Sequence, residues 1–121
     1  MADEVSDSIL NSVKKVCGVD PSYEAFDVDF LMYINSCFAD LNQLGVGPEE
    51  GFFIEDETQL WSEYLEDDFL LNNVKTYVNL KVRQMFDPPE TGHHVTMMSE
   101  QIKQHEFRIN MRAEEVKNAN A

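Results

Sequence analysis

Carboxylates are the most numerous side chains in this sequence that could do chemistry. They gather at residues 27–29, 55–57 and 66–68, where a Mg²⁺ or Ca²⁺ site would be sought because both ions prefer oxygen ligands. None of these clusters has the glycine-containing twelve-residue spacing of a calcium loop. Two of them stand where a helix begins and needs a cap. The pattern favours capping and solvated charge, so we predict no metal and no cofactor.

The histidines and cysteines are also poorly arranged for catalysis. His93 and His94 are adjacent, so their side chains point apart, and His105 is isolated in the sequence. Cys17 and Cys37 fall on apolar helix faces, where buried free thiols are expected, and neither has a histidine beside it. The sequence has no Gly-x-Ser-x-Gly elbow and no glycine-rich phosphate loop followed by Lys-Ser or Lys-Thr. We therefore predict that the protein is not an enzyme.

The charge balance narrows the function further. The 121 residues include 23 acidic and nine basic side chains, a net charge of −14. Because phosphate contacts require Lys or Arg, this balance disfavours nonspecific binding to nucleic acid or to an anionic membrane. Residues 1–68 hold 17 acidic and two basic side chains, whereas residues 69–121 hold six acidic and seven basic. We expect the two parts to face different surroundings.

Targeting signals are not expected either. No apolar run reaches the roughly 20 residues of a membrane span. The first four residues, MADE, are acidic and are the reverse of a signal peptide. The expectation is a soluble, intracellular protein with no membrane contact.

Hydrophobic periodicity predicts that helices position these residues. The clearest helix spans residues 67–86: apolar residues recur at the three-and-four spacing of one face, and two prolines follow it. We predict one all-α domain over residues 1–115, a four-helix-type bundle with a long Gly/Pro-bounded loop and a protruding C-terminal helix, followed by a frayed tail at residues 116–121. The other predicted helices are a first from Ser6 or Asp7 to Gly18, a second capped by Asp27 and ending at Gly45, a short one capped by Thr58, and a last one over residues 95–115.

The last predicted helix has more apolar surface than one bundle can use. Ile102 and Ile109 share one face, whereas Phe107 and Met111 fall well off it. The cations Lys103, Arg108, Arg112 and Lys117 accompany them. Part of this helix is therefore expected to meet another chain.

Short hydrophobic segments resemble the head-to-tail connector (adaptor) proteins of long-tailed bacteriophages. They are residues 41–48 (LNQLGVGP), Trp61, residues 74–83 (VKTYVNLKVR) and residues 86–89 (FDPP), and the likeness spans about residues 9–109. The resemblance implies an all-helical virion protein of the neck, assembled in the host cytoplasm. It also implies partners: a ring of copies, typically twelve, beneath the portal protein, and a further connector or tail-completion protein below.

In an assembly of this kind, three groups of residues are expected to face partners or DNA, and the third is placed from charge alone. The portal contact is expected at Lys103, Phe107, Arg108, Met111, Arg112 and Lys117, unless these residues close the core of their own chain. A neighbouring subunit or the next ring is expected at Val46, Pro48, Phe52 and Phe53, unless the two phenylalanines cover the end of the bundle. Channel-facing acid, past which DNA slides without specific binding, is expected at Glu49, Glu50, Asp56 and Glu57, unless it is a solvated outer face.

Two other functions are weighed against this interpretation. An acidic DNA mimic that occupies the cationic groove of a DNA-binding protein would explain the net charge, but it makes no use of the aromatic residues or of the Gly/Pro-bounded segments. A small metal-dependent nuclease is disfavoured because the sequence has no clustered ligands with an accompanying lysine.

Overall fold

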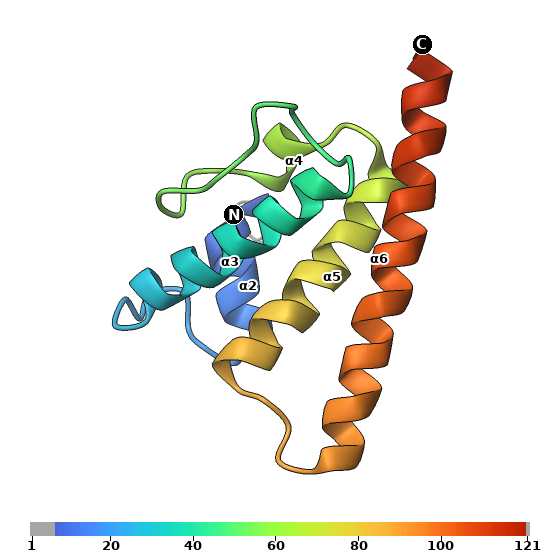
Figure 1. The fold of residues 1–121 in the computed structure, drawn as a ribbon. Helices are drawn as coiled ribbons and strands as arrows, with labels where there is room; N and C mark the ends of the chain where they lie inside the picture. The colour runs from blue at the N-terminus through green and yellow to red at the C-terminus, as the bar shows by residue number, and fades with distance from the viewer. Residues whose placement is uncertain (1–6, 121) are drawn as a thin grey trace.

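The protein is all-α, as predicted. The computed structural model describes residues 7–120, which form five helices (Figure 1). Their bounds are α2 (Ile9–Val16), α3 (Asp27–Gln43), α4 (Trp61–Tyr64), α5 (Asp68–Phe86) and α6 (Gly92–Asn120). The β pairing among these residues is limited to an isolated antiparallel bridge between Ser8 and Leu60. No helix within residues 7–120 combines the length and the apolar composition needed to cross a membrane.

Helix α5 is the central element of the fold. It packs against α2 and α3 and, along most of its length, against α6, and Figure 1 shows it between these two groups. Val74, Tyr77, Val78 and Val82 are fully buried along it. As predicted, an acidic residue caps its start: the Asp67 carboxylate accepts a hydrogen bond of 2.9 Å from the Leu70 N–H.

Helices α2 and α3 form the other side of the core. Ser8 caps α2 by accepting a hydrogen bond from the Asn11 N–H, so this helix begins slightly later than predicted. The predicted cap by Asp27 is wrong, because Phe26 occupies the cap position and Asp27 is the first helical residue. The Asp27 carboxylate instead lies 2.6 Å from Nζ of the fully buried Lys14, which ties α3 to α2. The Asp27 carboxylate therefore neutralises the buried charge of Lys14 instead of capping the helix.

The short helix α4 also differs from its predicted start. Leu60, not Thr58, is its cap residue, and the Leu60 N–H donates to the Glu63 carboxylate at 2.8 Å. Thr58 instead donates from its N–H and its hydroxyl to Asp56 two residues earlier. Trp61, the first residue of α4, is buried and donates its ring N–H to the Ser12 hydroxyl. One turn of helix thus carries the aromatic anchor between the loop and α2.

Helix α6 is longer at both ends than predicted. It begins at Gly92 because the Thr91 hydroxyl accepts the His94 N–H at 3.2 Å, as a capping residue does. It continues to Asn120, so residues 116–120 are helical where a frayed tail was expected, and Figure 1 shows its C-terminal turns projecting beyond the start of α5. Ile102, Ile109 and Ala113 are the buried residues of its inner face.

Candidate interaction surfaces

The solvent side of α6 carries an exposed apolar pair with cations beside it. Phe107 is 66% exposed and Met111 is 48% exposed, and both face away from buried Ile109. Lys103 and Arg108 are also exposed, and neither forms an ion pair within residues 7–120. We call Lys103, Phe107, Arg108 and Met111 the α6 outer face. The sequence prediction that Phe107 and Met111 lie off the core stripe is confirmed, and the alternative that they close the core is wrong.

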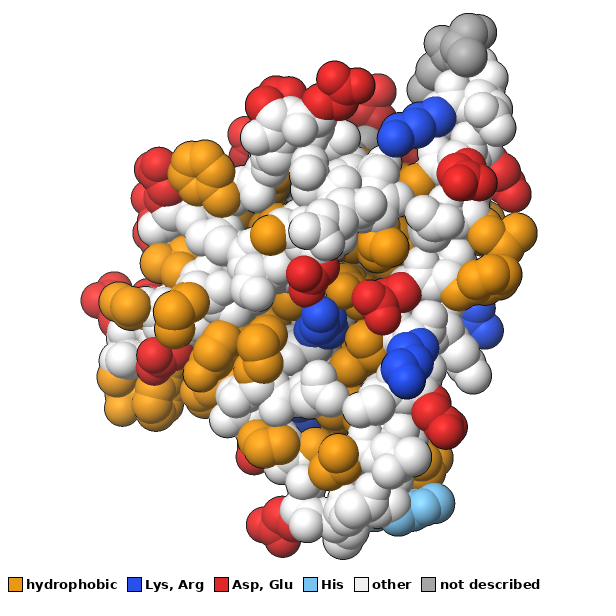
Figure 2. Space-filling view, viewed as in Figure 1, with side chains coloured by type: hydrophobic (Ala, Val, Ile, Leu, Met, Phe, Trp, Pro, Cys, Tyr) orange, Lys and Arg blue, Asp and Glu red, His pale blue; other side chains and the backbone are white. Residues whose placement is uncertain are grey.

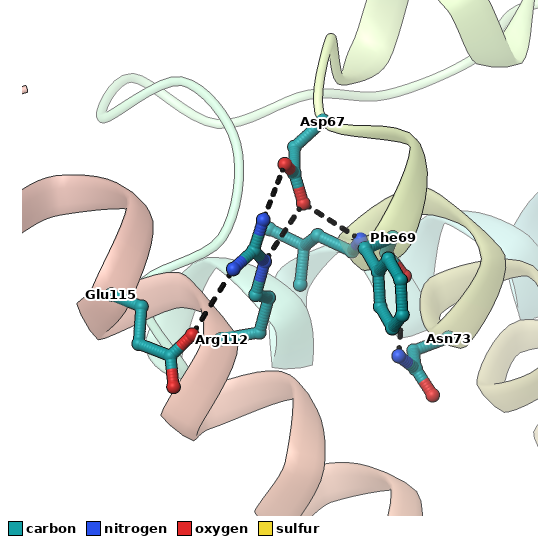
Figure 3. Close-up of polar contacts among 6 residues, drawn as sticks. Asp67, Phe69, Asn73, Arg112 and Glu115 are labelled. Carbon is teal, nitrogen blue, oxygen red and sulfur yellow. Dashed lines mark hydrogen bonds and ion pairs between the residues drawn. The ribbon is translucent and has the colours of Figure 1, made fainter. Parts of the chain in front are cut away.

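Arg112 does not belong to this free surface. Its guanidinium donates two hydrogen bonds to the Asp67 carboxylate, from Nε at 3.1 Å and from Nη2 at 2.9 Å, and a third to Glu115 at 3.1 Å (Figure 3). The guanidinium also lies over the ring of Phe69. Hydrogen bonding to Arg112 is the main cause that lowers the pKa of Asp67. The Arg112 donors therefore fasten α6 to the start of α5, which the sequence analysis did not predict, and a portal contact by Arg112 stays a prediction.

Lys117 lies farther along α6, beside the loop that follows α3. A Cβ atom placed on Gly45 would come within 3.1 Å of Lys117 Nζ, and Gly45 has a φ of +88°, which favours glycine. Both residues line an open groove of about 710 Å³, which the loop, residues 62–67 and the end of α6 enclose. The Tyr64 hydroxyl is buried at this groove without a hydrogen-bond partner among the described residues. Lys117 is exposed and remains available to a partner.

The predicted contact residues of the loop at residues 45–60 differ in how far they are exposed. Val46 is 2% exposed and packs in the core of its own chain, so its assignment to a subunit contact is wrong. Phe52 packs against Phe38 and Tyr64, with ring centroids 5.1 and 4.9 Å apart, and so covers the bundle end. Phe53 is 63% exposed. Pro48 is half-buried, so Phe53 is the large apolar side chain that the loop offers to a partner.

Side-chain amides hold the backbone of this loop. Asn35 on α3 donates to the Ile54 carbonyl at 2.9 Å and accepts the Ile54 N–H at 2.7 Å. Asn42 donates to the Pro48 carbonyl at 3.0 Å. The Gln59 amide oxygen accepts two backbone N–H groups, those of Glu55 and Asp56. The loop therefore presents its outward side chains from a fixed frame.

The predicted acidic residues Glu49, Glu50, Asp56 and Glu57 are all exposed on this loop. Figure 2 shows acidic side chains over the part of the molecule that the loop occupies. Hydrogen bonds from Thr58 lower the pKa of Asp56, so its carboxyl stays charged to lower pH than usual. Other carboxylates pair within the chain, as Asp27 does with Lys14 and Asp40 with Lys81. The loop thus carries a group of exposed carboxylates, while others, such as Glu90 and Glu114, are exposed elsewhere on the surface.

A further exposed surface was missed by the sequence analysis. Val28 is 77% exposed and Met32 is 61% exposed, one turn apart on the side of α3 that faces away from buried Phe30 and Ile34. Exposed Ser36 and Ala39 continue the same side. We call Val28, Met32, Ser36 and Ala39 the α3 outer face. The signal that identified Phe107 and Met111, two large apolar residues off the core stripe, was present here too.

Within residues 7–120 the possible metal ligands are dispersed, and both cysteine thiols are at least half-buried. No group of three His, Cys, Asp or Glu side chains within residues 7–120 could hold a metal ion. Burial raises the pKa of the Cys37 thiol to about 12, which removes the thiolate that nucleophilic chemistry requires. Cys17 is half-buried, and burial raises the pKa of its thiol as well.

The fold and these surfaces define a class: a small all-α protein with exposed apolar side chains on two of its helices. A family model described as phage connector protein matches residues 9–116. The chain belongs to this family of phage connectors, a family of structural proteins, and the resemblance noted in its sequence is confirmed. Comparisons with curated proteins and with solved structures found no match.

Proposed function

We propose that this connector is an adaptor in the neck of a tailed phage, where copies form a ring that docks on the portal and receives a further connector or tail-completion protein. The role is structural and has no catalytic step. Membership of the connector family supports it, as does the presence of several exposed contact faces on a small helical core. Twelve copies is the proposed stoichiometry, from the family resemblance.

Helix α6 is proposed to carry the portal contact. The observation behind this assignment is that the helix runs to Asn120 and projects past the start of α5, with exposed Lys117 near its end (Figure 1). Two hydrogen bonds from Arg112 to Asp67 attach the helix to the start of α5 just before this projection. A helix held at its base and free at its tip can enter a groove of another protein.

The exposed acidic side chains of the loop are proposed to lie along the DNA channel. Glu49, Glu50, Asp56 and Glu57 share a sign with the phosphates, so DNA would pass without finding a cationic partner. Changing all four to Gln or Asn tests this placement, with DNA retention and ejection as the readout. Unchanged ejection would assign these residues to a solvated outer face.

Complementation of a phage that lacks this gene tests the function as a whole. We expect the protein in purified particles, and we expect its loss to leave DNA-filled heads and tails that do not join. A chain truncated after Ala113 keeps Arg112 and the buried inner face of α6 but lacks Lys117, so it should fold and still fail to join heads to tails. The fold of the truncated chain is checked by circular dichroism. Particles that lack the protein, or normal joining by the truncated chain, would contradict the proposal.

A further inference from the structure

We infer that the α6 outer face of one copy binds the α3 outer face of the next copy, in a head-to-tail contact. The inference rests on the proposed function, because a connector that acts as a ring must bind itself. It goes further by naming the two faces that meet. It also narrows the portal contact to the projecting end of α6.

The two faces have matching apolar content. Each presents two large apolar side chains four residues apart on the solvent side of a long helix: Val28 and Met32 on α3, and Phe107 and Met111 on α6. Residues at this spacing form a ridge, and ridges of two helices interdigitate when the helices pack. The small residues Ser36 and Ala39 extend the α3 outer face and leave room for a close approach of the partner helix.

The charges beside these faces have opposite signs. Helix α3 contains three Asp residues and no Lys or Arg. Asp29 beside Val28 is unpaired within residues 7–120, and exposed Glu24 precedes the helix. The α6 outer face carries Lys103 and Arg108, and exposed Glu100 and Glu114 flank it on the same side of the helix. Pairing α3 with α6 brings Glu24 and Asp29 toward Lys103 and Arg108, whereas pairing the α3 outer face with itself would oppose like charges.

The two faces also lie on different sides of the molecule. Helices α3 and α6 each pack against α5, which separates them in Figure 1. In Figure 2, apolar side chains gather over the start of α3 at one margin and along α6 at the other. A contact between two different faces leaves one of each free on the joined pair, so copies add repeatedly and close into a ring when the rotation permits. Charge and placement thus select a second copy of this chain as the partner of both faces.

Crosslinking tests which faces meet. Met32→Cys is placed in one chain and Met111→Cys in a second chain with a tag of different mass, and both are supplied together to phage that lacks the gene. A short bismaleimide is then applied to the purified particles. We expect crosslinks between the two kinds of chain and none between chains of the same kind, and a chain with both substitutions should give a ladder. The parental chain, with Cys17 half-buried and Cys37 buried, and a Glu90→Cys chain, whose exposed site lies off both faces, are the controls.

Every other outcome would contradict either the inferred contact or the proposed adaptor role. Crosslinks between two Met111→Cys chains, or from Met111→Cys to a different protein, would overturn the inference and leave the adaptor role intact. Incorporated chains without any crosslink would do the same. Absence of the parental chain from the particles would overturn the adaptor role and the inference together.

Charge reversal gives an independent test by native mass spectrometry of isolated necks. Arg108→Glu and Glu24→Lys should each weaken association about two- to fivefold, the range expected for an exposed ion pair. A mixture of the two variants should recover part of this loss, because the Glu at position 108 of one chain can then pair with the Lys at position 24 of the other. Loss without recovery would argue against the contact.

Discussion

The loop at residues 45–60 and helix α6 reverse the roles that their sequences suggest. The loop has the glycine and proline of a free connection, yet Val46 and Ile54 are 2% exposed and Asn35 holds its backbone. Helix α6 is regular and long, yet Phe107 and Met111 have no partner in the core. Irregular backbone is therefore only partly free surface in this protein, because the loop buries Val46 and Ile54 and exposes Phe53. The exposed apolar pairs lie instead on regular helices whose inner faces already pack in the core.

The sharpest way to break this comparison is to remove the buried side chain of the loop. Ile54→Ala should lower the free energy of unfolding by about 2–5 kcal/mol, because it leaves a cavity in packed surroundings. Phe53→Ala, at the exposed neighbouring position, should change it by less than about 0.5 kcal/mol. Urea denaturation of both variants measures the difference. Equal effects would mean that the loop does not belong to the core.

The hydrogen bonds of the loop come next in expected effect. Asn35→Ala leaves the N–H and the carbonyl of Ile54 without their partner, and an unsatisfied buried group costs about 1–3 kcal/mol. Amide hydrogen exchange should show faster exchange at Ile54 than in the parental protein. Asn72→Ala, at an exposed position on α5, is the control and should leave the exchange of Ile54 unchanged.

The attachment of α6 gives a smaller effect that depends on pH. Since Arg112 lowers the pKa of Asp67 in the folded state, this pair contributes stability above the pKa of Asp in the unfolded chain, about 3.9. That contribution is lost as the pH falls through the lower pKa of the folded state. Arg112→Gln should therefore lower the Tm at pH 7 and should matter little near pH 2. A Tm difference that stays constant over this range would contradict the pairing.

The outer face of α6 should have the smallest effect on folding. The double variant Phe107→Ser, Met111→Ser should change the free energy of unfolding by no more than about 0.5 kcal/mol for each residue, because both side chains are exposed. The same variant should fail to join heads to tails. Ile109→Ala, at the buried position between them, should show the opposite pattern, with reduced stability of about 2–5 kcal/mol. Normal joining by the double variant would remove this face from the interface.

The sequence was sufficient for the parts of the fold that depend on local signals. The apolar stripe of α5, the cap at Asp67 and the prolines after Phe86 lie within one segment, and the helix follows them. Gly18 and Gly45 both adopt positive φ after a helix, as their positions predict.

Features that depend on distant residues were not predictable in this way. The caps assigned to Asp27 and Thr58 failed because a buried lysine thirteen residues away and a tighter turn with Asp56 competed for these side chains. The pairing of Arg112 with Asp67 was missed because the two residues lie 45 positions apart in the chain. The loop was assigned to a contact because nothing local indicates that Asn35 binds Ile54, nineteen residues away.

The length of α6 has a mechanical consequence. With 29 residues against 19 in α5, and a rise of about 1.5 Å per residue, it is roughly 15 Å longer than the helix on which it lies. The Arg112 guanidinium acts as a fulcrum near the start of the overhang. A tilt of only a few degrees at that point would move the tip by about 1 Å and leave buried Ile109, which precedes Arg112, in place.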